Sequence, residues 1–183
     1  MSRKYAIRSQ NHFYFVTFTV VHWIDVFIRN EYKDIFLESI RYCQKEKGLI
    51  VGAWVIMTSH IHLIVGIEED HQLADTIRDL KSYTSRHIRK YIQHSPQESR
   101  KDWMLWMMER AGQKLSNNKG FQFWLQHNHP IELNSNEKLK QRVDYIHQNP
   151  VEAGFVEEAQ HWKYSSAMDY CGEKGMIDLY LLY

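Results

Sequence analysis

Two histidines separated by one apolar residue, His60 and His62, are the side chains of this sequence best placed to do chemistry. They stand at the start of the apolar run His60–Val65, and a second apolar run, Trp54–Met57, precedes them. Two such runs are typical of two buried strands. Because side chains alternate faces along a strand, both imidazoles point to one side of a sheet and Ile61 points to the other. Two neighbouring imidazoles can bind one metal ion or hold one phosphate group.

The histidine pair alone is an incomplete metal site. A catalytic metal ion normally has about three protein ligands and open positions, and the sequence contains no His-Glu-x-x-His helix. A third ligand must therefore come from elsewhere in the chain. Two other interpretations stay open: unrelated histidines on a polar sheet face, and a histidine-triad nucleotide hydrolase. The triad pattern needs a third alternating histidine, and Ile64 stands there.

Composition sets limits on the class of protein. The 183 residues favour one domain over residues 1–183, with a helical insertion around 97–120. With 44% hydrophobic residues the chain is globular, and its net charge of +1 neither requires nor excludes nucleic acid. Cys43 and Cys171 form no metal or disulfide pattern, which indicates a reducing cytoplasm. No run is apolar enough to span a membrane, so we expect no membrane partner.

Periodicity predicts the elements that must position the histidines. The expected order is strand 12–21, helix 31–47, strand 49–57, strand 60–65 and helix 70–92. Gly48 ends the first helix, and the Thr58–Ser59 turn joins the second and third strands into a hairpin.

The second half of the chain is predicted to contain two helices and two short extended pieces. A Trp- and Met-rich helix is expected at 101–111, short extended pieces at 121–125 and 131–133, and a helix at 137–148. Asn134 and Glu137 resemble a capping box, and Asn149–Pro150 is expected to end the last helix. The whole order predicts an α+β fold, a ferredoxin-like or RRM-like sandwich with an antiparallel sheet and an added C-terminal helix.

The last helix offers a candidate for the missing ligand. Leu139, Val143 and Ile146 are spaced as a core-facing stripe. Tyr145 and Asn149 are four residues apart, so they lie on one flank beside that stripe. The alternative is that Tyr145 is a half-buried aromatic residue and Asn149 a simple helix terminator.

Two blocks of the sequence, Trp54–Leu63 and Tyr145–Gly154, resemble the signature blocks of single-tyrosine HUH transposases. The resemblance is closest to the REP-associated tyrosine transposases and their insertion-sequence relatives. Further matches are Asn128–Leu133 and Tyr164–Ala167, so the resemblance covers nearly the whole chain in the same order. One departure is Thr58–Ser59, where many relatives have Pro-Asn or Pro-Glu before the first histidine.

The resemblance implies a separate role for each residue of the site. His60, His62 and Asn149 would bind a divalent metal, Mg²⁺ or Mn²⁺, and Tyr145 would be the nucleophile. Its hydroxyl would attack single-stranded DNA, give a 5′-phosphotyrosine intermediate and leave a free 3′-OH, which later rejoins the DNA. The implied partners are single-stranded DNA with a hairpin-forming end and a second copy of the chain, as a homodimer.

The helix at 70–92 is our candidate for phosphate contacts, because it carries cations with hydroxyl groups between them. Its candidate DNA-binding residues are Arg78, Lys81, Ser85, Arg86 and Arg89. The alternative is an ordinary solvated helix face. The resemblance gives no role to the Trp- and Met-rich segment 101–119, which we interpret as a packing helix. At the level of function, the alternative is a non-catalytic RRM-like nucleic-acid-binding protein whose His-x-His motif is vestigial, with a nucleotide hydrolase third.

Overall fold

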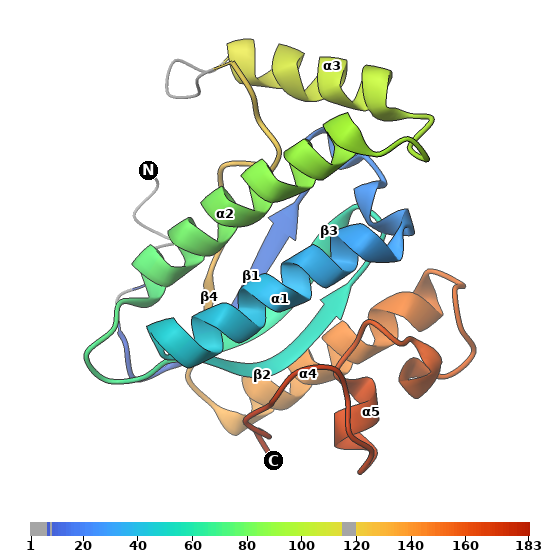
Figure 1. Ribbon diagram of the computed structural model, residues 1–183. Helices are drawn as coiled ribbons and strands as arrows, with labels where there is room; N and C mark the ends of the chain where they lie inside the picture. Colours follow the sequence, from blue (N-terminus) through green and yellow to red (C-terminus); the bar gives the residue numbers. More distant parts are fainter. Residues whose placement is uncertain (1–6, 8, 115–119) are drawn as a thin grey trace.

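A four-stranded antiparallel sheet with helices on both faces forms the centre of the molecule (Figure 1). The computed structural model describes residues 7, 9–114 and 120–183. The strands are β1 (Phe13–Thr19), β2 (Leu49–Ile56), β3 (His60–Ile67) and β4 (Ile131–Leu133), in the spatial order β2-β3-β1-β4. All three pairings are antiparallel, which confirms the predicted α+β sandwich. Among the described helices, none is long and apolar enough to cross a membrane.

Two long helices cover one face of the sheet. Helices α1 (Asn30–Lys47) and α2 (Leu73–His94) lie side by side there, and Figure 1 looks onto them. Gly48 ends α1 with a left-handed backbone (φ 60°), where an added Cβ would come within 2.5 Å of the His71 side chain. Helix α2 begins three residues later than predicted, because Asp70 has a left-handed conformation (φ 63°) that precedes the helix.

The predicted Trp- and Met-rich helix is confirmed as α3 (Lys101–Gln113), packed against α2. Met104 and Met108 are buried in the core shared with α1 and α2, whereas Trp103 and Trp106 are exposed. Residues 115–119 of the predicted insertion lie outside the described part of the chain. Division of the chain into one domain with an insertion around 97–120 remains a prediction.

Helix α4 (Asn136–Glu152) covers the opposite face of the sheet. Val143 and Ile146 are fully buried against Phe15 of β1 and Ile64 of β3, as the predicted stripe requires. The short elements are η2 (Val21–Trp23), η3 (Val26–Ile28), η4 (Ala159–His161) and α5 (Ala167–Tyr170).

Both predicted ends of the last helix are wrong. Ser135, rather than Asn134, is the N-cap, and its side chain accepts a hydrogen bond from the Lys138 N–H (3.3 Å). The residue three positions after this cap is Lys138, so Glu137 cannot close a capping box.

At the other end, α4 passes through Pro150 and ends at Glu152. Proline removes one backbone donor, but the buried Pro150 lies in the final turn, where N–H groups of Ala153 and Phe155 bond back to Asn149 and Pro150.

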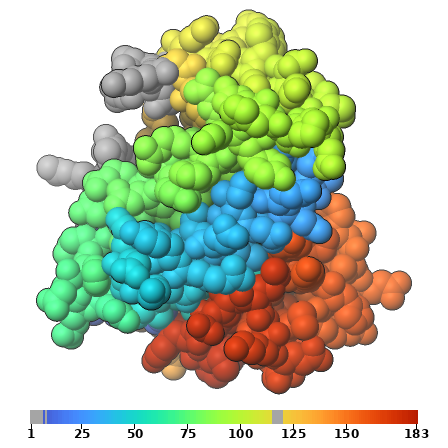
Figure 2. Space-filling view, viewed as in Figure 1, coloured from blue at the N-terminus to red at the C-terminus, as the bar shows by residue number. Residues whose placement is uncertain are grey.

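The C-terminal segment lies against β2 and α1. Figure 2 shows it, in red, beside the surface of α1. Side chains of Arg41 and Gln44 donate hydrogen bonds to the backbone carbonyls of Met176 and Asp178, and the Tyr180 N–H bonds to the Val51 carbonyl. This segment therefore covers part of the β2 edge of the sheet.

Candidate active site

His60 and His62 lie on the face of the sheet that α4 covers. Their ring centroids are 4.8 Å apart, and His62 is opposite Thr17 in the β1–β3 register. Their neighbours Ile61 and Leu63 point to the other face, into the core under α1 and α2. The predicted alternation is therefore confirmed.

The environment of His62 leaves one ring nitrogen available. Nδ1 is 2.8 Å from the Thr17 hydroxyl, while Nε2 is buried and has no hydrogen-bond partner among the described residues. Burial, with the nearby His60 and Arg142, lowers the pKa of His62 to about 3. The imidazole is therefore neutral at physiological pH, and with its proton on Nδ1 it presents a free lone pair at Nε2.

His60 is less buried than His62 and also has a hydroxyl near its Nδ1. Its Nδ1 is 3.3 Å from the Ser59 hydroxyl. Burial lowers the pKa of His60, while a hydrogen bond with the Asn149 side chain and the charge of Asp25 act in the opposite direction. His60 is thus also neutral, and its side chain contacts the residue predicted to be the third ligand.

Tyr145 extends from α4 to the histidine pair. Its ring meets His62 edge to face, with a centroid separation of 5.3 Å, and 40% of its surface remains exposed. Asn149 lies one turn further along and donates a hydrogen bond from its amide to the Tyr145 carbonyl (3.2 Å). All four residues predicted for catalysis and metal binding therefore meet in one place, and all come from one chain.

The donor set fits a divalent ion. The Nε2 of His62 is a buried polar atom with no hydrogen-bond partner in the described residues, and such an atom is costly unless something binds it. Hydroxyls at Nδ1 of both rings match the outer contacts that orient metal-binding histidines. In the described residues no three His, Cys, Asp or Glu side chains cluster as metal ligands. The amide of Asn149, next to His60, stays the predicted third ligand.

Sequence reasoning missed a cation at this site. The guanidinium of Arg142 lies 5.8 Å from the centre of the Tyr145 ring and 5.0 Å from that of Phe15. Arg142 precedes Tyr145 by three residues, the helical spacing that puts two side chains on one flank. That spacing was the available signal, and it places a positive charge beside the phenol.

A buried serine holds α4 in place. Ser166 Oγ accepts a hydrogen bond from the Trp54 N–H of β2 (2.9 Å) and is 2.9 Å from His147 Nε2 of α4. His147 is buried, and burial lowers its pKa to about 4, so this contact joins neutral groups. Because His147 is two residues from Tyr145, Ser166 fixes the helix segment that carries the phenol.

Replacing Ser166 by Ala should loosen this helix. The change leaves the Trp54 N–H and His147 Nε2 unsatisfied in the interior, which costs about 1–3 kcal/mol of stability. We expect that loss in urea unfolding, with a lower rate of DNA cleavage at temperatures where the variant is still folded. Ser165→Ala is the matched control, because Ser165 Oγ accepts a buried hydrogen bond from the Ala167 N–H of its own turn. The control should therefore also cost stability but leave the cleavage rate of the folded protein unchanged, and equal loss of cleavage in the two variants would contradict this role for Ser166.

The predicted DNA-binding residues of α2 do not form one surface. Arg78, Lys81 and Ser85 line a groove of about 760 Å³ beside residues 121–128. Arg78 pairs with Asp75 (2.6 Å), while Lys81 donates a hydrogen bond to the Leu125 carbonyl (2.8 Å).

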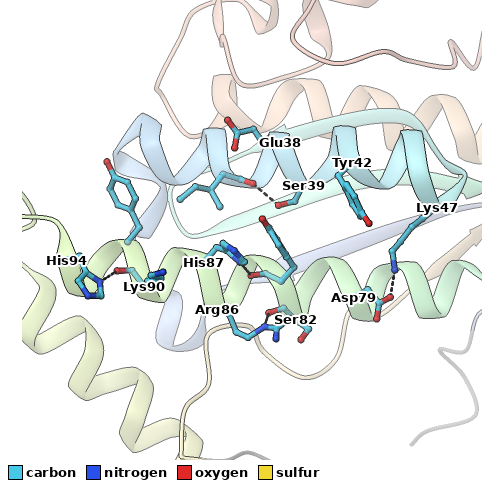
Figure 3. A pocket seen from close by; sticks show the side chains of 13 residues that line it. Glu38, Ser39, Tyr42, Lys47, Asp79, Ser82, Arg86, His87, Lys90 and His94 are labelled. Atoms are coloured by element: carbon cyan, nitrogen blue, oxygen red, sulfur yellow. Dashed lines mark hydrogen bonds and ion pairs between the residues drawn. The ribbon is translucent and has the colours of Figure 1, made fainter.

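The other two cations predicted to bind DNA face elsewhere. Arg89 pairs with Glu109 of α3 (3.2 Å) and lies over the Phe121 ring. Arg86 lines a second groove, of about 830 Å³, between α1 and α2. Figure 3 shows the side chains around it, with Tyr42 from α1 and Lys90 from α2 among them. That groove is on the helical layer, across the sheet from His60 and His62.

Comparison with known proteins identifies the family of the chain. The family model described as "Transposase IS200 like" matches residues 9–111. Among solved structures, a REP-associated tyrosine transposase bound to a REP hairpin has a TM-score of 0.66 at 17% identity, covering 98% of this chain and 94% of that chain. A transposase candidate from Deinococcus radiodurans R1 is 18% identical over 79% of this chain and 92% of that chain, with a TM-score of 0.44. No curated protein sequence matches the chain.

Proposed function

Because the chain belongs to the family of IS200-like transposases, we propose that it cuts and rejoins single-stranded DNA with Tyr145 as nucleophile and a divalent metal as cofactor. One observation carries this proposal: the Tyr145 ring lies 5.3 Å from His62 within the same chain. A phenol beside two neutral imidazoles and a guanidinium is an arrangement suited to phosphoryl transfer.

The proposed reaction has two steps. In the first, the Tyr145 oxygen attacks a DNA phosphorus, the bond to the 3′-oxygen breaks, and the phenolic proton leaves to solvent while the 3′-oxygen takes up a proton. The product is a 5′-phosphotyrosine and a free 3′-OH. In the second, a 3′-OH attacks that phosphorus, the bond to Tyr145 breaks, and DNA is rejoined. The bond energy is kept in the phosphotyrosine, so no external energy source is needed.

His60, His62 and Asn149 would hold the metal. When bound there, Mg²⁺ or Mn²⁺ would polarise the scissile phosphate and offset the negative charge that builds on its oxygens. Arg142 supplies a second positive charge on the phenol side, where it would offset negative charge that builds on the phosphate. Thr17 and Ser59 hold the two rings by Nδ1, so each can present Nε2.

The solved relative is bound to a REP hairpin, and we propose a hairpin-forming DNA end for this chain as well. The phosphate contacts proposed for α2 are Arg78, Lys81, Ser85, Arg86 and Arg89, of which the first three share one groove. We also retain the homodimer as a proposal, although the site itself is assembled from one chain. Cys43 and Cys171 are both free thiols, which suits the reducing cytoplasm that we propose as its compartment.

A cleavage assay with controlled metal tests the proposal. We expect purified protein to cut single-stranded DNA carrying a hairpin when Mn²⁺ or Mg²⁺ is present, and to form a protein–DNA adduct that survives denaturation. EDTA should abolish both products, and added Mn²⁺ in excess should restore them. Cleavage that is unchanged in EDTA would contradict metal dependence. Binding without cleavage under every metal condition would instead favour the non-catalytic RRM-like alternative.

A further inference from the structure

Trp23 is a large aromatic side chain that lies at the mouth of the candidate active site. Its ring meets His60 edge to face, with centroids 5.4 Å apart, and 60% of the residue is exposed. A tryptophan exposed to this extent contributes little to the core. Its position beside His60 therefore calls for an explanation other than packing.

The backbone that carries Trp23 is strained. His22 and Trp23 are consecutive residues with positive φ angles of 56° and 55°, a region that residues with a Cβ seldom occupy. Bulky residues stay in such conformations only when the surrounding structure holds them, and they cluster at functional sites. In this conformation the Trp23 ring lies against His60.

The surrounding structure does hold this segment. The Val20 N–H bonds to the Ser59 carbonyl (2.9 Å), and the Phe27 N–H bonds to the Thr58 carbonyl (2.8 Å). Hydrogen bonds on both sides of Trp23 thus tie the segment to the turn that precedes His60. These bonds therefore hold the backbone of Trp23 beside the turn that leads into His60.

We propose that Trp23 is a stacking platform for a nucleobase of the single strand, next to the phosphate that Tyr145 attacks. The inference rests on the proposed function and adds a binding contact to it. Every base has a flat apolar face, so an exposed indole holds a base in single-stranded DNA whatever its identity. In a duplex the same face is covered by the neighbouring base pairs, so this contact selects unpaired DNA. In this proposal Trp23 positions the DNA strand, and Tyr145 attacks its phosphate.

The chain provides a matched pair of substitutions. Trp23→Gly removes the indole, and His22→Gly alters the adjacent residue; both introduce glycine where φ is positive, so neither should lower the melting temperature. Trp23→Phe keeps an aromatic face. Each change is made in a Tyr145→Phe protein with Mn²⁺, so that DNA is bound but not cut.

Binding is measured by fluorescence anisotropy with a labelled oligothymidine strand, and contact by photocrosslinking of a strand that contains 5-iodouracil. We expect Trp23→Gly to weaken binding roughly five- to hundredfold, which is the value of one stacked base. Trp23→Phe should retain most of the affinity, His22→Gly should retain all of it, and the crosslink should map to Trp23.

Two results would overturn the inference in distinguishable ways. Unchanged affinity of Trp23→Gly, with crosslinks at other residues, would remove the stacking role and leave the proposed function in place. Failure of the parent protein to bind single-stranded DNA at all would remove the proposed function, and the platform with it.

Discussion

Replacing Tyr145 by Phe should abolish the covalent protein–DNA adduct and leave DNA binding intact. The substitution removes only the oxygen that attacks phosphorus, and the ring that contacts His62 and Phe15 remains. Loss of a nucleophile lowers turnover by several orders of magnitude, on the order of 10⁶-fold in a well-studied case. The measurement is a denaturing gel with end-labelled single-stranded DNA, paired with an equilibrium binding assay.

Tyr42→Phe is the matched control for that experiment. Tyr42 is also exposed, but it belongs to α1 and lines the groove on the other side of the sheet. We expect its adduct yield to equal that of the unmodified protein. An adduct that persists in Tyr145→Phe would show that another residue attacks DNA.

Removing His62 should eliminate metal binding and DNA cleavage together. The His62→Ala change deletes the buried Nε2 that has no protein partner in the described chain. Loss of an outer contact of a metal ligand costs about 10–100-fold in affinity, so loss of the ligand itself should cost at least about a hundredfold. Titration of Mn²⁺ followed by electron paramagnetic resonance measures the affinity directly.

Three further variants make that result specific. His62→Gln fills most of the volume and guards against a packing defect, and Thr17→Val removes only the hydroxyl at Nδ1. Thr17→Val should weaken Mn²⁺ binding by about 10–100-fold. His87→Ala, on the far side of the sheet, should have no effect. Full Mn²⁺ affinity in both His62 variants would exclude His62 as a ligand.

Much of the fold follows from local patterns. Nearly continuous runs of β-branched, aromatic and aliphatic residues define β1 and β3, and the spacing of Leu139, Val143 and Ile146 is that of an amphipathic helix. Period-two alternation also predicts correctly that His60 and His62 share a face. These features need no knowledge of distant residues, and sequence patterns therefore identify them.

Other features depend on contacts between distant residues. The pairing of Thr17 with His62 is a consequence of strand register, and the Ser166–His147 contact joins two segments that meet only in the folded chain. The strained conformation of Trp23 is set by bonds to the turn before His60. Local sequence gives no signal for any of these.

The α2 cations illustrate a related limit. The sequence shows that the helix carries cations with hydroxyl groups between them. Only the folded structure shows that Arg78 and Lys81 share a groove. It also shows that Arg89 pairs with Glu109 instead. Similarly, the N-cap is Ser135 and not the neighbouring Asn134. Both residue types are good N-caps, so the sequence of the segment does not decide between two positions one residue apart.

The most direct test of the central claim is the identity of the amino acid that carries the DNA. Unmodified protein is incubated with single-stranded hairpin DNA and Mn²⁺, the adduct is isolated under denaturing conditions, and both components are digested for mass spectrometry. We predict one nucleotide-modified peptide, with the 5′-phosphate linked to Tyr145, together with a DNA fragment that ends in a free 3′-OH. A phosphate linked to any other residue, or cleavage that leaves no protein linkage, would contradict the assignment.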